Sequence, residues 1–152
     1  MNNRIRLQAV VVRASRILMA RLFQDGLTWW CLPGGGQEPG ETPDEGVLRE
    51  LSEECNVHGR IVRKLGHMFF ANGDEAITFF IDIGNQEPSL GIEPEAIKLG
   101  VASPLVDVKF LGLTEIPERD RAFLWAAGLL GVEGFTQLVE SWGDDVSYPD
   151  RS

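Results

Sequence analysis

The sequence predicts a single α/β domain, and three observations carry this prediction. The chain has 152 residues, a length that suits one domain around one hydrophobic core. Short runs rich in apolar and β-branched residues recur between turn signals, which is typical of strands. Two segments, residues 43–55 and 117–130, have apolar residues at the spacing of an amphipathic helix. Since no repeat or linker interrupts the pattern, we expect one domain over residues 1–152, with a flexible tail at about 144–152.

The N-terminal part is expected to form a β-hairpin followed by a glycine-rich loop. Residues 4–13 and 17–23 are the predicted strands of the hairpin. A short extended piece, residues 28–32, ends at Pro33 because proline cannot donate a hydrogen bond to a neighbouring strand. The four glycines in residues 34–40 indicate a loop, and they allow the backbone to come close to a ligand.

The start of the first helix is clearly marked. Thr42 and Glu45 form a capping box, and Pro43 occupies the first helical position. The helix is expected over residues 43–55, and Asn56 is expected to end it in the left-handed conformation that asparagine tolerates. The predicted buried face of the helix consists of Val47, Leu48, Leu51 and Cys55.

The rest of the chain alternates between predicted strands, loops and helices. Glycines and prolines interrupt residues 90–106, so no regular element is predicted there. Helices are expected over residues 117–130 and, in a shorter piece, 132–142. The predicted strands are residues 57–65, 67–70, 76–83 and 106–111.

Composition excludes several classes of function. The formal net charge of −9 argues against a general nucleic-acid-binding surface, which would be basic. Cys31 and Cys55 have no CxxC spacing, which favours two buried thiols in a reducing compartment over a disulfide framework or a zinc site. The apolar runs are shorter than the ~20 residues of a membrane span, and the N-terminus has no signal-peptide pattern. We therefore expect a cytoplasmic protein that binds neither nucleic acid nor membrane.

Glu50, Glu53 and Glu54 form an acidic stripe along the predicted helix. Their spacing places neighbouring carboxylates roughly 6 Å apart, where each pair repels by roughly 3 kcal/mol at an effective dielectric near 20. A solvated helix face is the ordinary interpretation of such a stripe. Here, however, the stripe borders the buried face, Arg49 lies four residues before Glu53, and a glycine loop precedes the helix. These features favour a site for Mg²⁺ or Mn²⁺ and indicate phosphate chemistry.

The stretch from Gly35 to Val57 resembles the signature of the Nudix hydrolases. That signature is Gly, five residues, Glu, seven residues, Arg-Glu, an aliphatic residue, any residue, Glu-Glu, any residue, Gly and an aliphatic residue. The chain matches it with Gly35, Glu41 and the run Arg49-Glu50-Leu51-Ser52-Glu53-Glu54-Cys55-Asn56-Val57. Asn56 replaces the final glycine, which is expected to matter little because asparagine also adopts a left-handed helix exit.

The resemblance implies an α/β/α sandwich with a mixed central sheet and a site for a divalent metal ion. Glu50, Glu53 and Glu54 would be the main ligands of Mg²⁺ or Mn²⁺. A backbone carbonyl at Gly34 or Gly35 would join them.

The resemblance also assigns roles to residues around the metal. Arg49 would orient the carboxylates, and Glu41 would support the metal shell. Glu50 and Glu53, with Arg49, would be the catalytic residues of the helix. The general base varies within the family, so Glu50 stays open beside three later acids, which are Glu93, Glu95 and Asp107.

The implied reaction is attack of water on one phosphorus of a nucleoside diphosphate linked to another group. The secondary marks of the ADP-ribose, dinucleotide, NADH and coenzyme A subfamilies are absent, which favours a nucleoside triphosphate or a modified nucleotide. A nucleotide sugar such as ADP-ribose and a catalytically silent nucleotide-binding domain remain alternatives. Gly34, Gly36 and Trp30 are expected near the substrate, although core packing is the more ordinary role of a tryptophan. The resemblance is also compatible with a homodimer.

Overall fold

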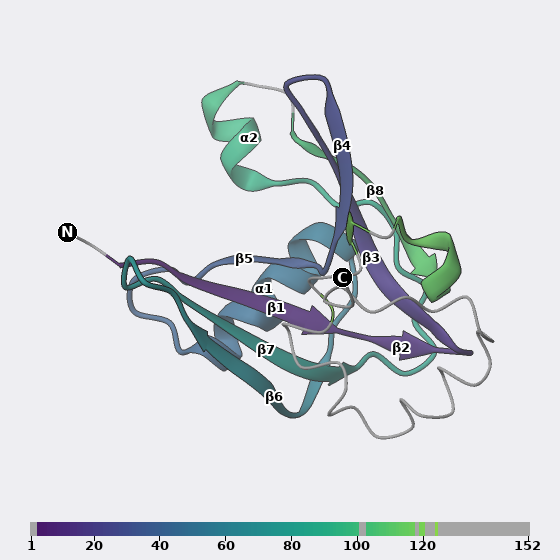
Figure 1. The fold of residues 1–152 in the computed structure, drawn as a ribbon, viewed down its shortest axis with the longest axis horizontal. Helices are drawn as coiled ribbons and strands as arrows, with labels where there is room; N and C mark the ends of the chain where they lie inside the picture. The colour runs from purple at the N-terminus through teal and green to yellow at the C-terminus, as the bar shows by residue number, and fades with distance from the viewer. Residues whose placement is uncertain (1–2, 101–102, 118, 121–123, 125–152) are drawn as a thin grey trace.

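The computed structural model describes residues 3–100, 103–117, 119, 120 and 124, which form a mixed α/β fold (Figure 1). The strands lie in two sheets of four. The first sheet has the order β5 (Gly34–Gly36), β1 (Ile5–Val10), β7 (Glu75–Asp82) and β6 (Arg60–Phe69). The second sheet holds β2 (Val12–Arg13), β3 (Arg16–Gln24), β4 (Leu27–Cys31) and β8 (Leu105–Leu111). Because β1 and β7 are parallel while the other neighbours in the first sheet are antiparallel, the expected mixed sheet is confirmed.

Helix α1 (Pro43–Cys55) lies across one face of the first sheet (Figure 1). Both bonds of the predicted capping box are present, since Thr42 Oγ1 accepts from the Glu45 amide at 3.2 Å and the Glu45 carboxylate accepts from the Thr42 amide at 2.9 Å. Asn56 ends the helix with a φ of 55°, in the left-handed region. These local signals therefore set both ends of α1 as predicted.

The apolar face of α1 and the inner face of β1 and β7 form the first of two core clusters. Val47, Leu51 and Cys55 are buried in it, and Leu48 packs against its edge. A second cluster is formed mainly by residues of β3, β8 and the segment after β8, and it includes Leu32, at the end of the segment that leads into β5. The two clusters together fix the position of β5 relative to α1.

The glycine run is not a loop, and this prediction was wrong. Gly34–Gly36 form β5, which pairs antiparallel with β1 so that Gly35 lies opposite Leu7. A β-carbon on Gly34 would collide with the carbonyl oxygen of Leu7. The lack of side chains is what allows this strand to lie so close to β1.

Three other predicted boundaries also differ from the structure. The first strand is divided at Val11, where the chain passes from the first sheet to the second, so the hairpin is formed by β2 and β3. Residues 57–65 and 67–70 were predicted as two strands, but Arg60–Phe69 form the single strand β6, in which two register shifts absorb the irregularity. The segment without a predicted element contains helix α2 (Pro94–Leu99).

A short 3₁₀ helix, Leu113–Glu115, follows β8. Of the predicted helix at 117–130, the structure describes only residues 117, 119, 120 and 124. The helix expected at 132–142 and the tail expected at 144–152 lie outside the described residues.

Candidate active site

The three glutamates of the stripe line one cavity together with the glycines of β5. The cavity has a volume of about 230 Å³ and lies where α1 faces β5 and the start of α2. Five carboxylate side chains line it: Glu38, Glu50, Glu53, Glu54 and Glu93. The fold thus gathers acidic residues from three separate parts of the chain around one small volume.

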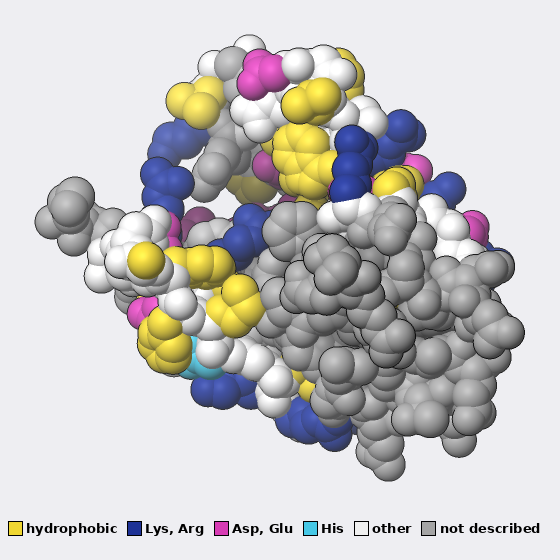
Figure 2. Space-filling view, viewed as in Figure 1, with side chains coloured by type: hydrophobic (Ala, Val, Ile, Leu, Met, Phe, Trp, Pro, Cys, Tyr) yellow, Lys and Arg dark blue, Asp and Glu magenta, His cyan; other side chains and the backbone are white. Residues whose placement is uncertain are grey.

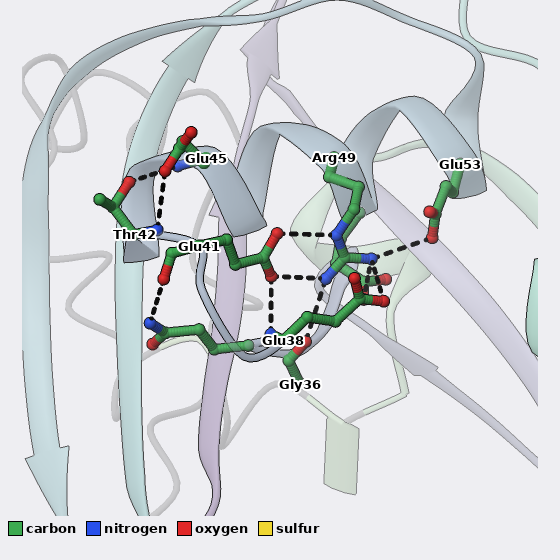
Figure 3. A network of polar contacts seen from close by, with 9 residues as sticks. Gly36, Glu38, Glu41, Thr42, Glu45, Arg49 and Glu53 are labelled. Atoms are coloured by element: carbon green, nitrogen blue, oxygen red, sulfur yellow. Dashed lines mark hydrogen bonds and ion pairs between the residues drawn. The ribbon is translucent and has the colours of Figure 1, made fainter.

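Arg49 connects the acidic stripe to the loop after β5 (Figure 3). Its Nη1 atom donates to Glu50 Oε1 at 3.0 Å and to Glu53 Oε2 at 3.2 Å. Its Nη2 atom also donates to the carbonyl oxygen of Gly36 at 3.1 Å. The predicted pairing of Arg49 with Glu53 is present, and the same guanidinium also holds Glu50.

Glu41 is held by Arg49 and lies behind the cavity wall. Both of its oxygens accept from Arg49, at 2.8 and 3.0 Å, and Oε1 also accepts from the Glu38 amide at 2.7 Å. The hydrogen bond from Arg49 is the largest cause that lowers the pKa of Glu41 below its usual range. In this arrangement Glu41 acts on the cavity through Arg49 and the loop, and it is not part of the cavity lining.

Glu54 is the most deeply buried acid of the stripe. Only 7% of it is exposed, and Oε1 accepts from the Gly34 amide at 2.7 Å. Burial raises the pKa of Glu54 to about 8, helped by the charges of Glu50 and Glu93 and opposed by the Gly34 hydrogen bond and Arg6. A cation placed beside this carboxylate would relieve the unfavourable burial of its charge.

The glycines of β5 allow the carboxylates to lie against the backbone. A β-carbon on Gly35 would stand 2.5 Å from the Glu50 carboxylate, so a side chain there would displace Glu50. A β-carbon on Gly36 would meet no atom within 4 Å. Gly34 and Gly35 are therefore needed for close approach, whereas Gly36 borders open space.

Of the later acids considered as general base, Glu93 is the one that the structure brings into the cavity lining. Glu93 precedes α2, and its Oε1 accepts from Ser103 Oγ at 2.8 Å. Asp107 lies on β8 opposite Arg21, does not line the cavity, and accepts from the amide of Val108. The side chain of Glu95 lies outside what the structure describes. Among the candidate bases whose side chains the structure describes, Glu50 and Glu93 line the cavity and Asp107 does not.

Trp30 is not brought to the cavity. It packs against the second core cluster, and its ring faces Lys109 Nζ at 5.6 Å. Its amide donates to Asp120 Oδ2 at 3.0 Å. The ordinary role of a tryptophan, packing, therefore fits this position better than contact with the substrate.

Six further residues line the cavity that sequence reasoning did not select as site residues, and Arg6 and Cys31 are two of them. Arg6 comes from β1 and Cys31 from the end of β4. Burial raises the pKa of the Cys31 thiol to about 11, so this thiol stays protonated at neutral pH. Arg6 could have been found only by knowing that β1 pairs with β5, because its neighbours in the sequence carry no phosphate-binding pattern.

Comparison with known proteins identifies the family. The family model of the NUDIX domain matches residues 3–127. The chain belongs to the Nudix family. Two solved Nudix structures share its fold at low identity. A NUDIX hydrolase from Nitrosomonas europaea has a TM-score of 0.64 at 17% identity, over 97% of this chain and 77% of that chain. A MutT NUDIX hydrolase from Burkholderia pseudomallei has a TM-score of 0.57 at 23% identity, over 80% of this chain and 95% of that chain.

A curated relative is similar over a shorter stretch. Mouse diphosphoinositol polyphosphate phosphohydrolase 3-alpha is 49% identical over 45 residues, which are 30% of this chain. The match spans only 27% of the length of the mouse protein. This likeness is confined to that stretch and leaves the substrate to be argued from the site.

Nudix hydrolases generally use divalent metal ions such as Mg²⁺, and the residues around the cavity fit such an ion. Carboxylate and backbone carbonyl oxygens are the hard donors that Mg²⁺ and Mn²⁺ prefer. As the side chains lie, no three acidic, His or Cys residues among those described stand close enough together to hold a metal. In this arrangement Arg49 Nη1 bonds Glu50 and Glu53, and Glu54 accepts from the Gly34 amide.

The described helices include none that is both long and apolar enough to cross a lipid bilayer.

Proposed function

We propose that this Nudix protein is a Mg²⁺- or Mn²⁺-dependent pyrophosphohydrolase acting on a nucleoside diphosphate derivative, with nucleoside triphosphates or modified nucleotides as its main substrates. The observation that carries the proposal is that Glu50, Glu53 and Glu54 line one cavity beside the glycine strand β5. An anionic diphosphate enters so acidic a cavity only together with cations. The hard oxygen donors therefore favour a metal ion, and the metal ion in turn allows an anionic diphosphate to bind.

The residues of the chain would have separate roles in this reaction. Glu50, Glu53 and Glu54 would hold the metal, with a backbone carbonyl at Gly34 or Gly35. Mg²⁺ or Mn²⁺, when bound, supplies charge neutralisation for the diphosphate and lowers the pKa of a coordinated water.

Arg49 and Glu41 would keep the acidic stripe in place. Their bidentate bond fixes the guanidinium, which in turn limits the rotation of Glu50 and Glu53. The proton of the attacking water would pass to a carboxylate oxygen of Glu50 or of Glu93. Substitution of each by glutamine identifies the base, because the base variant loses the acidic limb of the pH–rate profile.

The likeness to the mouse relative favours a second candidate substrate, a diphosphoinositol polyphosphate. Both substrate classes contain a diphosphate, so the metal site serves either of them. The remaining two candidates are hydrolysis of a nucleotide sugar such as ADP-ribose and a binding-only role. A product-resolved screen of triphosphates, nucleotide sugars, dinucleotides and diphosphoinositol polyphosphates with Mg²⁺ or Mn²⁺ separates all four. Absence of turnover across the panel would contradict the proposed activity.

Glu53→Gln provides the sharpest test of the metal assignment. We expect turnover to fall to a few per cent of wild type or less, because a ligand charge is lost. The free energy of unfolding should stay about equal, since relief of the repulsion from the acidic neighbours offsets the weaker bond from Arg49. Asp44→Asn on the same helix is the matched control, because Asp44 does not line the cavity, and it should keep its activity. Activity of Glu53→Gln well above a few per cent would make the assignment wrong.

A cytoplasmic location, a single domain over residues 1–152, a homodimer and a lack of nucleic-acid binding stay predictions from the sequence. Size-exclusion chromatography with light scattering measures the oligomeric state.

A further inference from the structure

The cavity beside α1 is too small for a whole nucleotide. Its volume is about 230 Å³, whereas sites for small organic ligands usually measure about 300–1,000 Å³. A diphosphate and its metal ion would occupy most of this space. The rest of the substrate must therefore lie in a neighbouring hollow.

A second cavity adjoins the first along β1. It has a volume of about 430 Å³ and lies between the start of β1, β5 and the turn that joins β6 to β7. Arg6 and Gly36 line both cavities. Because a β-carbon on Gly36 would meet no atom within 4 Å, the space above this residue is open where the two cavities adjoin. The space-filling view shows basic and acidic side chains together around the hollow between α2 and β1 (Figure 2).

Arg6 stands at the junction with its side chain available to a ligand. It lies opposite Gly36 on one side and Ala76 on the other, and it is exposed. Within the described part of the chain, its guanidinium forms no hydrogen bond or ion pair, and the charge of Glu54 acts on it at longer range. A guanidinium between an acidic metal site and an open cavity is suited to a phosphate oxygen.

Phe70 supplies an aromatic surface in the second cavity. It follows β6 and is 46% exposed, and the turn fixes its backbone because its amide donates to the Asp74 carbonyl at 2.9 Å. The acids of this cavity already have partners. Asp74 Oδ1 accepts from the Arg4 amide at 3.0 Å, and Glu75 bonds His67 Nε2 at 2.6 Å. The cavity thus offers a guanidinium at its entrance and an aromatic ring on its wall.

The charge of the second cavity discriminates between substrate classes. Its described lining contains Arg4 and Arg6 but also Asp74 and Glu75, so its formal charge is balanced. An inositol ring with several phosphates would need an excess of cations. A nucleotide needs a contact for its phosphate and a flat surface for its base.

We infer that the second cavity is the nucleoside subsite, in which Arg6 binds a phosphate of the substrate and Phe70 stacks on an aromatic base. This inference rests on the proposed function, and it selects a nucleotide over a diphosphoinositol polyphosphate. The opposite end of the first cavity, lined by Leu22, Glu93 and Pro104, contributes neither a cation nor an aromatic ring among the described residues. A third hollow, which shares Gly36 and Glu38 with the first cavity, has a cation but no aromatic ring in its described lining. The hollow past Arg6 offers both, so the organic part of the substrate is assigned to it.

Calorimetric titration of the full chain with Mg²⁺ tests the subsite. The ligands are the four nucleoside triphosphates with methylene groups at both bridging positions, which cannot be hydrolysed, and methylenediphosphonate, which has no base. The variants are Arg6→Gln and Phe70→Leu. Their matched controls are Lys64→Gln, an exposed cation on β6, and Phe69→Leu, an exposed phenylalanine that does not line the cavity. Thermal unfolding of every variant verifies that the fold is kept.

We expect at least one nucleotide to bind about tenfold more tightly than methylenediphosphonate, because base stacking adds to the affinity. Phe70→Leu should weaken nucleotide binding about tenfold and leave methylenediphosphonate binding unchanged. Arg6→Gln should weaken nucleotide binding to a similar extent, and both controls should bind as wild type does.

The subsite would be overturned if Phe70→Leu lost the same affinity for the nucleotide as for methylenediphosphonate. It would also be overturned if neither variant lost affinity for the nucleotide. Tighter binding of a diphosphoinositol polyphosphate than of every nucleotide would overturn it as well. Turnover of ordinary nucleotides is measured separately. The expected binding pattern without turnover would refute the hydrolase and keep the subsite, whereas turnover that is insensitive to both variants would refute the subsite alone.

Discussion

At the scale of single residues, the shape of the Arg49 side chain organises the acidic site. Its guanidinium bonds both oxygens of Glu41 and reaches Glu50 and Glu53 with the remaining nitrogen. A planar fork with five donors can do this, whereas a lysine ammonium is a single point charge. The Nudix resemblance assigned an orienting role to Arg49, and these bonds explain how it would be carried out.

Asn56 has two functions that substitution can separate. It holds a φ of 55°, and its side-chain amide donates to Ser89 Oγ at 3.0 Å and to the Leu90 carbonyl at 3.2 Å. We expect Asn56→Gly to change the free energy of unfolding by less than about 1 kcal/mol, because relief of the left-handed conformation offsets the lost bonds. Asn56→Ala loses the same bonds without relieving the left-handed conformation, so it should lower the free energy of unfolding by about 1–3 kcal/mol. Urea denaturation measures both values, and a glycine variant less stable than the alanine variant would contradict this account.

At the scale of elements, β5 shows that its three glycines are not equivalent. A β-carbon on Gly34 would strike the Leu7 carbonyl, while one on Gly36 would meet nothing. We expect Gly34→Ala to reduce the free energy of unfolding by about 1–3 kcal/mol, because β5 must move away from β1. Gly36→Ala, two residues along the same strand, should be neutral or slightly stabilising. Equal midpoints for the two variants in thermal unfolding would show that the close approach is not needed.

The sequence predicted α1 closely but not the arrangement of the strands. The capping box at Thr42, the apolar period and the Asn56 exit are local signals, and all three are present in the structure. The pairing of β5 with β1 depends on residues about thirty positions apart in the chain, which no local pattern encodes. The glycines were misjudged as a loop for the same reason, since their strand conformation comes from the partner and not from propensity.

The site shows the same contrast between local signals, which the sequence reveals, and contacts that depend on the tertiary fold. The fixed spacing on one helix predicted that Glu50, Glu53 and Glu54 would act together, and they line one cavity. Arg6 and Glu93 reach that cavity from β1 and from the start of α2, which only the tertiary fold brings near α1. Trp30 does not line this cavity, because closeness in sequence to the glycines does not decide which side of β4 a residue faces, and its contact with the substrate stays a prediction.

At the scale of the whole molecule, acidic charge is concentrated around one cavity, where Glu54 is buried. The chain has a net charge of −9, and five of its carboxylates line a single cavity of about 230 Å³. Burial and the neighbouring acids raise the pKa of Glu54 to about 8, so the metal-free protein holds a proton there at neutral pH. A metal ion and that proton therefore compete for the same carboxylate.

This competition predicts opposite pH dependences for the metal-free and the metal-bound protein. Glu54 has an ordinary pKa of 4.5 in the unfolded chain and about 8 in the fold, so between these values the folded state binds more protons. The contribution of Glu54 to stability is thus complete below pH 4.5 and is lost as the pH rises towards 8. Mg²⁺ binds the ionised form, so its stabilising effect should grow over the same range, by up to about tenfold in affinity per pH unit. Thermal unfolding from pH 6 to 9, with and without Mg²⁺, measures both trends. Glu54→Gln, which keeps an oxygen for the Gly34 amide, should flatten both trends, and an unchanged slope in that variant would assign the pH dependence to other groups.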